Sequence, residues 1–300
     1  MKKLLITALA TGMSVISLAQ TVNLTTFADD GYTQNFDSLS ITASNIALTA
    51  NGGEFNNGAG ATLPGWYYGN ANNAGYNLFA SDGGSNTGRY YSFGTMTPSV
   101  SSDRALGTVS SGTPGTMNTG VRFTNGTGTS TGLFVVQFDL EQWRQGGNTA
   151  SHGLQLSYKL VKGGGGFVQA DFNTGTGYTT AGIKTQTTTT DDTGLVNLSG
   201  ETTNTTIMGP IVGANTTPNT LDGNLVANSV RVRTVIQLFA LGQSFDPSDE
   251  IIFRWSDVND TGNDHGFGID NVEAVPEPAS MIAMGLGLAG LVARRRRASK

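Results

Sequence analysis

Short segments in which apolar and polar residues alternate recur along the chain, with Gly, Asn and Thr turns between them. Residues 153–160 (GLQLSYKL) alternate cleanly, as a strand with one buried face does. Residues 133–140 (LFVVQFDL) and 230–241 (VRVRTVIQLFAL) contain longer apolar runs, which suit central strands. Further strands are predicted at 250–257, 266–275, 35–40, 89–95, 104–110 and 120–124. No segment between 20 and 274 has the period of an amphipathic helix, so the pattern predicts an all-β body.

The body is expected to be a two-layer antiparallel β-sandwich of the jelly-roll or lectin-like kind. Charged residues make up only 13% of the chain and Gly occurs 42 times, which fits many short strands joined by tight turns. No repeat of fixed period is evident, which disfavours a solenoid or propeller. A Thr-rich insertion at about 173–219 is compatible with an exposed loop, a hairpin or a sheet edge.

The N-terminus has the layout of a secretory signal peptide. Lys2 and Lys3 are followed by an apolar stretch at 4–16 and by a small-x-small site at 17–19. We therefore predict a signal peptide at 1–19 that is cleaved between Ala19 and Gln20, and export through the Sec translocon. A buried N-terminal helix is the alternative.

The C-terminus carries a second apolar segment. Residues 279–293 contain no charge and are followed by four arginines, which favour the cytoplasmic side of a membrane. Fifteen residues are short for a membrane-spanning helix, which needs about 20. The pattern predicts a short transmembrane helix that anchors the chain weakly, with the body outside the cytoplasm.

This C-terminus also resembles a known family. Pro276, Glu277 and Pro278, then the short Gly/Leu/Ala segment, then the arginines, resemble the PEP-CTERM sorting signal over the last 26 residues, the basic group being Arg294, Arg295, Arg296 and Arg297. The resemblance implies a sorting tail at 275–300, after a body at 20–274. It also implies an exosortase, a membrane protease acting in trans, that processes the tail. The chain would be tethered briefly to the inner membrane and then handed to the cell surface or extracellular matrix.

The body resembles, more loosely, a group of uncharacterised secreted domains from environmental bacteria. The resemblance supplies no function, and it rests on ordered motifs: FDSL at 36–39, LPGW at 63–66, NTG at 86–88, YSFG at 91–94, DRALG at 103–107, GVRFTN at 120–125, EQWR at 141–144, FRWSD at 253–257, DHG at 264–266 and IDN at 269–271.

Charge and cysteine content exclude several functions. The formal net charge is −5, but seven of the 17 basic residues lie in the terminal segments, so the body itself is strongly acidic. An acidic body with no basic stripe would repel phosphate backbones, so we expect no nucleic-acid partner. The chain contains no cysteine, which excludes disulfides, thiolate metal sites and a cysteine nucleophile.

The loop at 257–266 is the richest cluster of oxygen ligands in the sequence. Asp257, Asn259, Asp260 and Asp264 could supply a hard cation such as calcium with side-chain oxygens. The spacing differs from that of an EF-hand, and a plain Asx-rich turn explains the same residues. Calcium is therefore a candidate cofactor and not a requirement.

Evidence for catalysis is weak, and we expect a non-catalytic protein. Asp139 and Glu141 lie two apart on one strand, about 7 Å from each other, which is compatible with paired glycosidase carboxylates. The flanking residues of lectin-like glycosidases are missing, and no GxSxG elbow or P-loop is present. His152 and His265 lie far apart in sequence, at no metal-ligand spacing.

Other charged and aromatic residues leave two readings open. Glu141, Arg144 and Asp270, with Arg104 and Arg254, would form a ligand groove or ion pairs at strand ends. The WYY and YY motifs at 66–68 and 90–91 would stack on sugars or pack in the core. The sequence thus predicts an exported surface or matrix protein, with polysaccharide binding, a calcium-stabilised adhesive module and, least favoured, polysaccharide hydrolysis as the candidate activities.

Overall fold

The computed structural model describes residues 20–25, 31–42, 44–56, 58, 62–96, 103–188, 202–211 and 217–277. The predicted signal peptide, the segment 279–293 and the four C-terminal arginines lie outside these residues. Among the described residues, no helix is long and apolar enough to cross a membrane.

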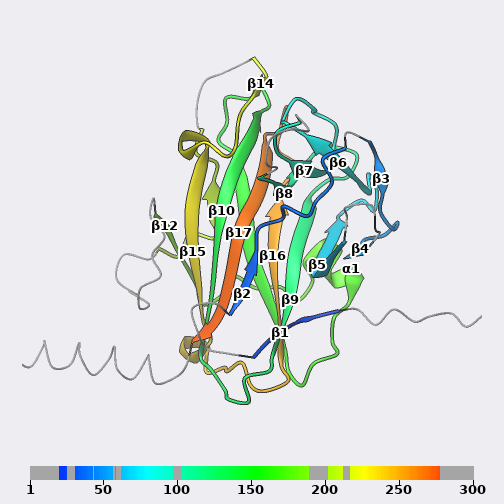
Figure 1. Ribbon diagram of the computed structural model, residues 1–300. Helices are drawn as coiled ribbons and strands as arrows, with labels where there is room; N and C mark the ends of the chain where they lie inside the picture. Colours follow the sequence, from blue (N-terminus) through cyan, green and yellow to red (C-terminus); the bar gives the residue numbers. More distant parts are fainter. Residues whose placement is uncertain are drawn as a thin grey trace, which may run out of the picture.

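The body consists of two packed β-sheets (Figure 1). The smaller sheet has seven strands in the order β13-β11-β16-β9-β5-β4, with β1 beside β9. Its strands are β1 (Val22–Leu24), β4 (Gly53–Asn56), β5 (Thr62–Asn70), β9 (Met117–Asn125), β11 (Gly153–Val161), β13 (Thr206–Met208) and β16 (Glu250–Asp257).

The larger sheet has ten strands in the order β12-β15-β10-β17-β8-β7-β6-β3, with β14 beside β10 and β2 beside β17. Its strands are β2 (Tyr32–Gln34), β3 (Ile46–Ala47), β6 (Asn77–Ser81), β7 (Arg89–Phe93), β8 (Ala105–Val109), β10 (Leu133–Gln145), β12 (Ile183–Thr188), β14 (Asn219–Thr220), β15 (Ser229–Gln237) and β17 (Gly266–Glu277). Pairing is antiparallel except for β1 with β9 and β6 with β7. The predicted all-β sandwich is confirmed.

Alternation along the strands divides the side chains between the core and the outer faces. On β10, Phe134, Val136, Phe138 and Leu140 belong to the main core between the sheets. Leu133, Val135 and Trp143, which point to the opposite face of the strand, belong to separate outer clusters. Within the core, the indole rings of Trp66 and Trp255 stack 5.6 Å apart, and Phe138 meets Trp255 edge-on. The period of two therefore gives each sheet an inner and an outer face.

A short helix that the sequence does not predict, α1 (Gln169–Thr174), covers part of the smaller sheet's outer face. Its Phe172 is fully buried with Tyr67 and Ile252. Six residues are too few to establish a helical period, and Gly175 ends the helix in the left-handed conformation. Two single turns of 3-10 helix, η1 (Val226–Asn228) and η2 (Leu238–Leu241), flank β15, so the strand predicted to reach 241 ends at 237.

The strand predicted at 35–40 is wrong. These residues form a turn in which the Asn35 side chain donates to Asp37 and the Leu39 amide to the Phe36 carbonyl. Asn, Asp and Ser favour such local bonds over a strand ladder. Phe36 adopts a positive φ of 53° and packs its ring against Trp66. The apolar residues of this segment therefore enter the core from a turn.

The Thr-rich stretch contributes a strand to each sheet. Its β12 pairs with β15 at the edge of the larger sheet, and its β13 pairs with β11 at the edge of the smaller one. The stretch therefore runs from the larger sheet to the smaller one and supplies an edge strand to each.

Candidate functional site

Two histidines and two aspartates meet where the loop between β16 and β17 passes from the smaller sheet to the larger. His152 directly precedes β11, and β11 pairs with β16, whose last residue Asp257 lies opposite Leu154. Asp260, Asp264 and His265 belong to the connecting loop. Strand pairing thus brings together His152 and His265, which are 113 residues apart in the sequence.

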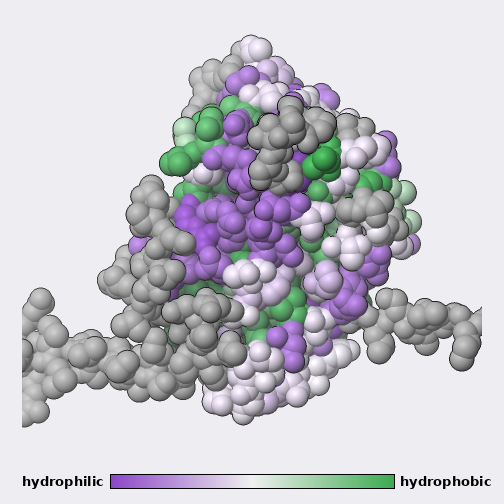
Figure 2. Space-filling model, viewed as in Figure 1, coloured by the Kyte–Doolittle hydropathy of each residue, from purple (hydrophilic) through white to green (hydrophobic). Residues whose placement is uncertain are grey.

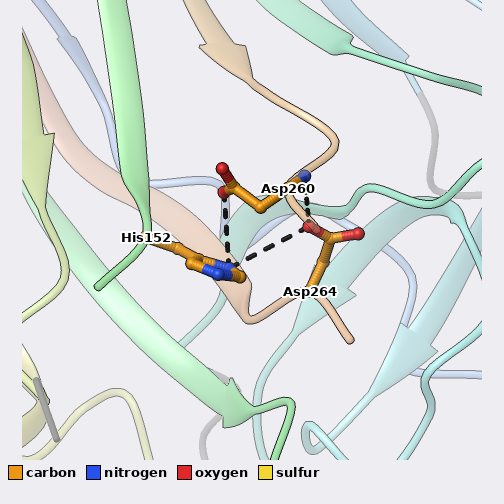
Figure 3. Close-up of side chains that lie close together, drawn as sticks. All are labelled: His152, Asp260 and Asp264. Atoms are coloured by element: carbon orange, nitrogen blue, oxygen red, sulfur yellow. Dashed lines mark hydrogen bonds and ion pairs between the residues drawn. The ribbon is translucent and has the colours of Figure 1, made fainter. Parts of the chain in front are cut away.

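The cluster of His152, Asp260 and Asp264 has the ligand types of a metal site (Figure 3). The His152 Nδ1 lies 3.4 Å from an Asp260 carboxylate oxygen and 3.9 Å from one of Asp264. One ligand atom from each residue lies within 4.8 Å of the others. His152 and Asp264 are buried, whereas the Asp260 side chain is 38% exposed and connects the cluster to solvent.

Neighbouring groups fix the two imidazole rings. The His152 and His265 rings stack with their centroids 4.4 Å apart. The Gly146 amide donates to His265 Nδ1 at 2.9 Å. The Asn148 side-chain amide lies 3.2 Å from His152 Nε2 and donates to the Thr261 carbonyl at 2.6 Å. The His152 Nδ1 faces the two carboxylates and lies 3.5 Å from the His265 backbone N–H, which donates to it.

Burial favours the neutral forms of His152, His265 and Asp264. Loss of solvent lowers the pKa of His152, and it lowers that of His265 to about 4, with a further contribution from His152. Burial likewise raises the pKa of Asp264 to about 6. The cluster can therefore hold a proton between imidazole and carboxylate, or exchange it for a metal ion. Imidazole suits zinc, copper or nickel better than calcium, which takes oxygen ligands.

The four residues predicted to bind calcium are not brought to one point. Asp260 and Asp264 converge, while Asn259 is exposed. Asp257 is 3% exposed and accepts hydrogen bonds from the Thr108 hydroxyl at 2.8 Å and the Ser110 amide at 3.1 Å, which join the two sheets. Burial raises the pKa of Asp257 to about 8. Sequence reasoning missed His152 because only the pairing of β11 with β16 places it beside the loop.

The carboxylates considered for catalysis lie in different surroundings. Asp139 is 3.5 Å from the Arg231 guanidinium and accepts from the Asn271 amide at 3.0 Å. Glu141 is buried and accepts from the Trp143 indole at 2.8 Å. Burial raises the pKa of Glu141 to about 8. Asp139 is thus held as an ion pair, and Glu141 is not.

The expected ion pairs with Arg104, Arg144 and Arg254 are not formed in the described part of the chain. These guanidinium groups donate to backbone carbonyls instead. Arg104 donates to Ser92 and Thr95, and Arg144 to Gly83 and Gly84. Arg254 donates to Phe172. The aromatic candidates Trp66, Tyr67, Tyr68, Tyr90 and Tyr91 are all at most 2% exposed. They pack inside the protein and offer no ring face to a sugar.

The predicted processing sites lie at the limits of the described chain. The Gln20 amide donates to Glu54 at 3.4 Å, and its carbonyl accepts from the Tyr67 hydroxyl, so the predicted mature N-terminus rests on the smaller sheet. Pro276 and Glu277 are the last two residues of β17 and pair with Phe134 and Leu133 of β10. Ala19 and Pro278 lie outside the described residues. The sorting sequence thus begins inside a central strand, with no linker after the body.

Comparison with known proteins identifies the C-terminal segment. Residues 274–297 match the PEP-CTERM protein-sorting motif. No curated protein matches the chain. The chain therefore carries the sorting tail of an exported protein, as its C-terminal pattern predicts, whereas the resemblance of its body to a secreted domain family stays a prediction.

Proposed function

We propose that this chain is an exported protein that an exosortase processes at Pro276, Glu277 and Pro278, and that its non-catalytic β-sandwich is delivered to the cell surface or extracellular matrix. The observation that carries the proposal is the match to the sorting motif at residues 274–297. The signal-peptide pattern at 1–19 and the acidic, cysteine-free body support it.

The pairing of β17 limits where processing can occur. Val275 and Pro276 pair with Val135 and Phe134, and the Pro276 side chain is buried. Cleavage before Val275 would remove the last rungs of a central strand and expose the apolar residues of β10. Cleavage after Pro276 would remove only the end pair of the strand, Glu277 with Leu133. We therefore expect the mature body to end at Pro276 or beyond.

The test replaces Glu277 with Gln in a chain tagged inside the body and expressed in a host that has an exosortase. The expected result is loss of tail removal and retention of the chain in the membrane fraction. Glu273→Gln, four residues earlier on the same strand, is the matched control and should be processed normally. Normal processing of Glu277→Gln would overturn the proposal.

A metal-stabilised adhesive module is the second candidate function, favoured by the convergence of His152, Asp260 and Asp264. A metal there would tie the loop after β16 to the start of β11, the neighbouring strand of the smaller sheet. Binding requires a His152 Nδ1 that carries no proton, because only the free lone pair can bind a metal. A thermal shift in zinc or nickel that is absent in Asp264→Asn and present in Asn259→Ala would support this function, and equal shifts in both variants would exclude it.

Polysaccharide is a candidate ligand of this module. Because the aromatic rings are buried, its support is the hydrophilic surface over β10, β15 and β17 (Figure 2). Hydroxyl-rich polymers are bound there by hydrogen bonds to polar and charged side chains. A glycan array probed with the body tests this, and binding unchanged by Asp139→Ala, on β10, whose side chain is 25% exposed, would argue against this face.

A further inference from the structure

Three acidic residues lie near one another on the outer face of the larger sheet, away from the His152 cluster. In the register of β10 and β17, Asp139 lies opposite Asp270 and Glu141 opposite Gly268. Glu141 and Asp270 are therefore diagonal neighbours on one face, with Cα atoms about 7–8 Å apart. Asp103, just before the neighbouring strand β8, directs its carboxyl to that of Asp270. Strands that are distant in sequence thus place three acidic residues on one face, with the carboxyl groups of Asp103 and Asp270 in contact and Glu141 beside them, more widely spaced than the ligand atoms of the His152 cluster.

A β-bulge positions Asp270 on this face. Between the pairs Asp139–Asp270 and Gln137–Glu273, β17 contains one residue more than β10. The extra residue is Asn271, with a positive φ of 46°, a conformation that Asn tolerates better than most residues. The bulge allows Val272 and Ala274 to face the core while Asp270 and Glu273 both face outward. Bulges often re-aim a side chain in this way near functional sites.

Asp270 is buried and has no satisfactory partner. It is 1% exposed, and neither of its carboxylate oxygens makes a hydrogen bond of good geometry. The side chain that meets it, Asp103, is another acid, and two carboxyl groups bond to each other only when one is protonated. A buried charge without a counter-charge or hydrogen bonds is strongly unfavourable.

Nearby positive charges do not neutralise the group. Arg231 is bound to Asp139 and to Glu273, and Arg104 and Arg144 donate to backbone carbonyls. Glu141, 4% exposed, receives the Trp143 indole N–H and no cationic side chain among the described contacts. Burial, reinforced by the charge of Glu141, raises the pKa of Asp270 to about 9. These acids therefore hold protons that a cation of sufficient charge would replace.

We propose that the carboxylates of Asp103, Glu141 and Asp270 bind a hard divalent cation, with calcium as the expected ion. The donors are all oxygens, which hard cations prefer, and no imidazole takes part. Asp103 is exposed and gives access from solvent, whereas Glu141 and Asp270 form the buried floor. Water molecules would complete the coordination. The site does not depend on exosortase processing or on the loop at 257–264.

Trp143 provides a specific probe. Terbium substitutes for calcium in oxygen sites and luminesces when an excited indole lies close by. The Trp143 indole is bonded to Glu141, while Trp66 and Trp255 stack in the core between the sheets. Terbium added to the purified mature protein should therefore luminesce on tryptophan excitation, and millimolar calcium should quench the signal by displacement. Extracellular calcium modules bind with Kd of about 10⁻⁴–10⁻³ M.

The variants are chosen so that the fold survives. Asp270→Asn and Glu141→Gln copy the neutral forms of these acids, and Asp103→Asn changes an exposed residue. Calcium at 100 times its Kd should raise the Tm of the wild-type protein by about 5–10 °C. Each variant should lose most of this shift and of the terbium signal, whereas Asp264→Asn, in the His152 cluster, should keep both. The absence of any wild-type response to calcium at concentrations up to about 100 mM, or a response that Asp270→Asn and Asp103→Asn leave unchanged, would overturn the proposal.

Discussion

Two clusters of buried acids, one on the outer face of each sheet, differ in whether a cationic side chain pairs with them. On the smaller sheet, Arg122 donates to Glu250 at 2.8 Å and to the Tyr67 hydroxyl at 3.0 Å, and Glu250 also accepts from the Gly165 amide. The segment that includes α1 covers these groups, and Arg254 beneath it donates to the Phe172 carbonyl. On the larger sheet, Glu141 and Asp270 are equally buried but have no cationic side chain.

This difference separates a structural face from a candidate binding face. A charge that is paired and hydrogen-bonded within the protein needs nothing from outside, whereas an unpaired buried acid must keep a proton or bind a cation. On the smaller sheet the protein itself supplies the counter-charge, Arg122, for the buried acid Glu250. The missing counter-charge on the larger sheet therefore points to an external ion.

Breaking the ion pair between Arg122 and Glu250 should have the largest effect on stability. Arg122→Met leaves Glu250, which is 6% exposed, without its charge partner, and we expect a loss of about 3–5 kcal/mol in the free energy of unfolding. Urea denaturation monitored by tryptophan fluorescence measures it. The double variant Arg122→Met/Glu250→Gln should recover part of the loss, and a loss below about 1 kcal/mol in the single variant would contradict the comparison.

Removing a buried acid from the cluster of Glu141 and Asp270 should raise the free energy of unfolding, and the gain should depend on pH. The pKa values of about 8 for Glu141 and about 9 for Asp270 exceed those of the unfolded chain, so the metal-free folded protein binds more protons. Its free energy of unfolding should therefore fall as pH rises from about 5 to 9. In EDTA, Asp270→Asn should be as stable as the wild type at pH 5 and more stable at pH 9. Parallel pH curves for the two proteins would remove the basis for an unpaired acid.

The Trp143 indole contributes one neutral hydrogen bond to the unpaired face. Trp143→Phe removes the donor to Glu141, and the loss of that bond from a buried acceptor should cost about 1–3 kcal/mol. Because this bond lowers the pKa of Glu141, the variant's stability should also fall more steeply with pH in EDTA. Thermal melts at two pH values check both effects. The matched control Tyr91→Phe removes a hydroxyl from the same outer cluster without contacting Glu141.

Exposed ion pairs should have the smallest effect. Lys162 lies 2.5 Å from Asp246 and 2.6 Å from Asp249, but its side chain is 54% exposed. Lys162→Met should lower stability by at most about 1 kcal/mol at neutral pH. Hydrogen bonds from Lys162 hold the pKa of Asp246 below its usual range, so this contribution exists above about pH 4 and is lost as pH falls. A loss of the same size at pH 7 and at pH 2 would show that packing of the lysine stem is responsible.

The sequence predicted most of the fold because the long strands are amphipathic. The segments at 133–140, 153–160 and 250–257 lie in β10, β11 and β16; clean alternation predicted 153–160, and a longer apolar run predicted 133–140. The turn at 35–40 and helix α1 could not be predicted, because each depends on a ring entering a core that distant strands build, Phe36 beside Trp66 and Phe172 beside Tyr67. Local pattern carries no information about such contacts.

The candidate sites also differ in how far the sequence could predict them. The sorting motif is a contiguous stretch of sequence, so its order of Pro-Glu-Pro, apolar segment and arginines was sufficient to predict it. The clusters around His152 and Asp270 depend on strand register and on the bulge at Asn271. The sequence showed that Asp260 and Asp264 were candidate ligands, but not that an imidazole would join them. Likewise, the sequence suggested that Asp139 and Glu141 act together. In the structure Arg231 forms an ion pair with Asp139, and the unpaired acid beside Glu141 is Asp270.

The intact mass of the protein recovered from cells that have an exosortase tests the central claim most directly. The account predicts a chain that begins at Gln20 and ends at Pro276 or shortly beyond it, found in the surface or matrix fraction. The same chain expressed without the exosortase should keep its tail and remain with the membrane. A full-length mass in both hosts, or a mature chain that ends before Val275, would contradict the account.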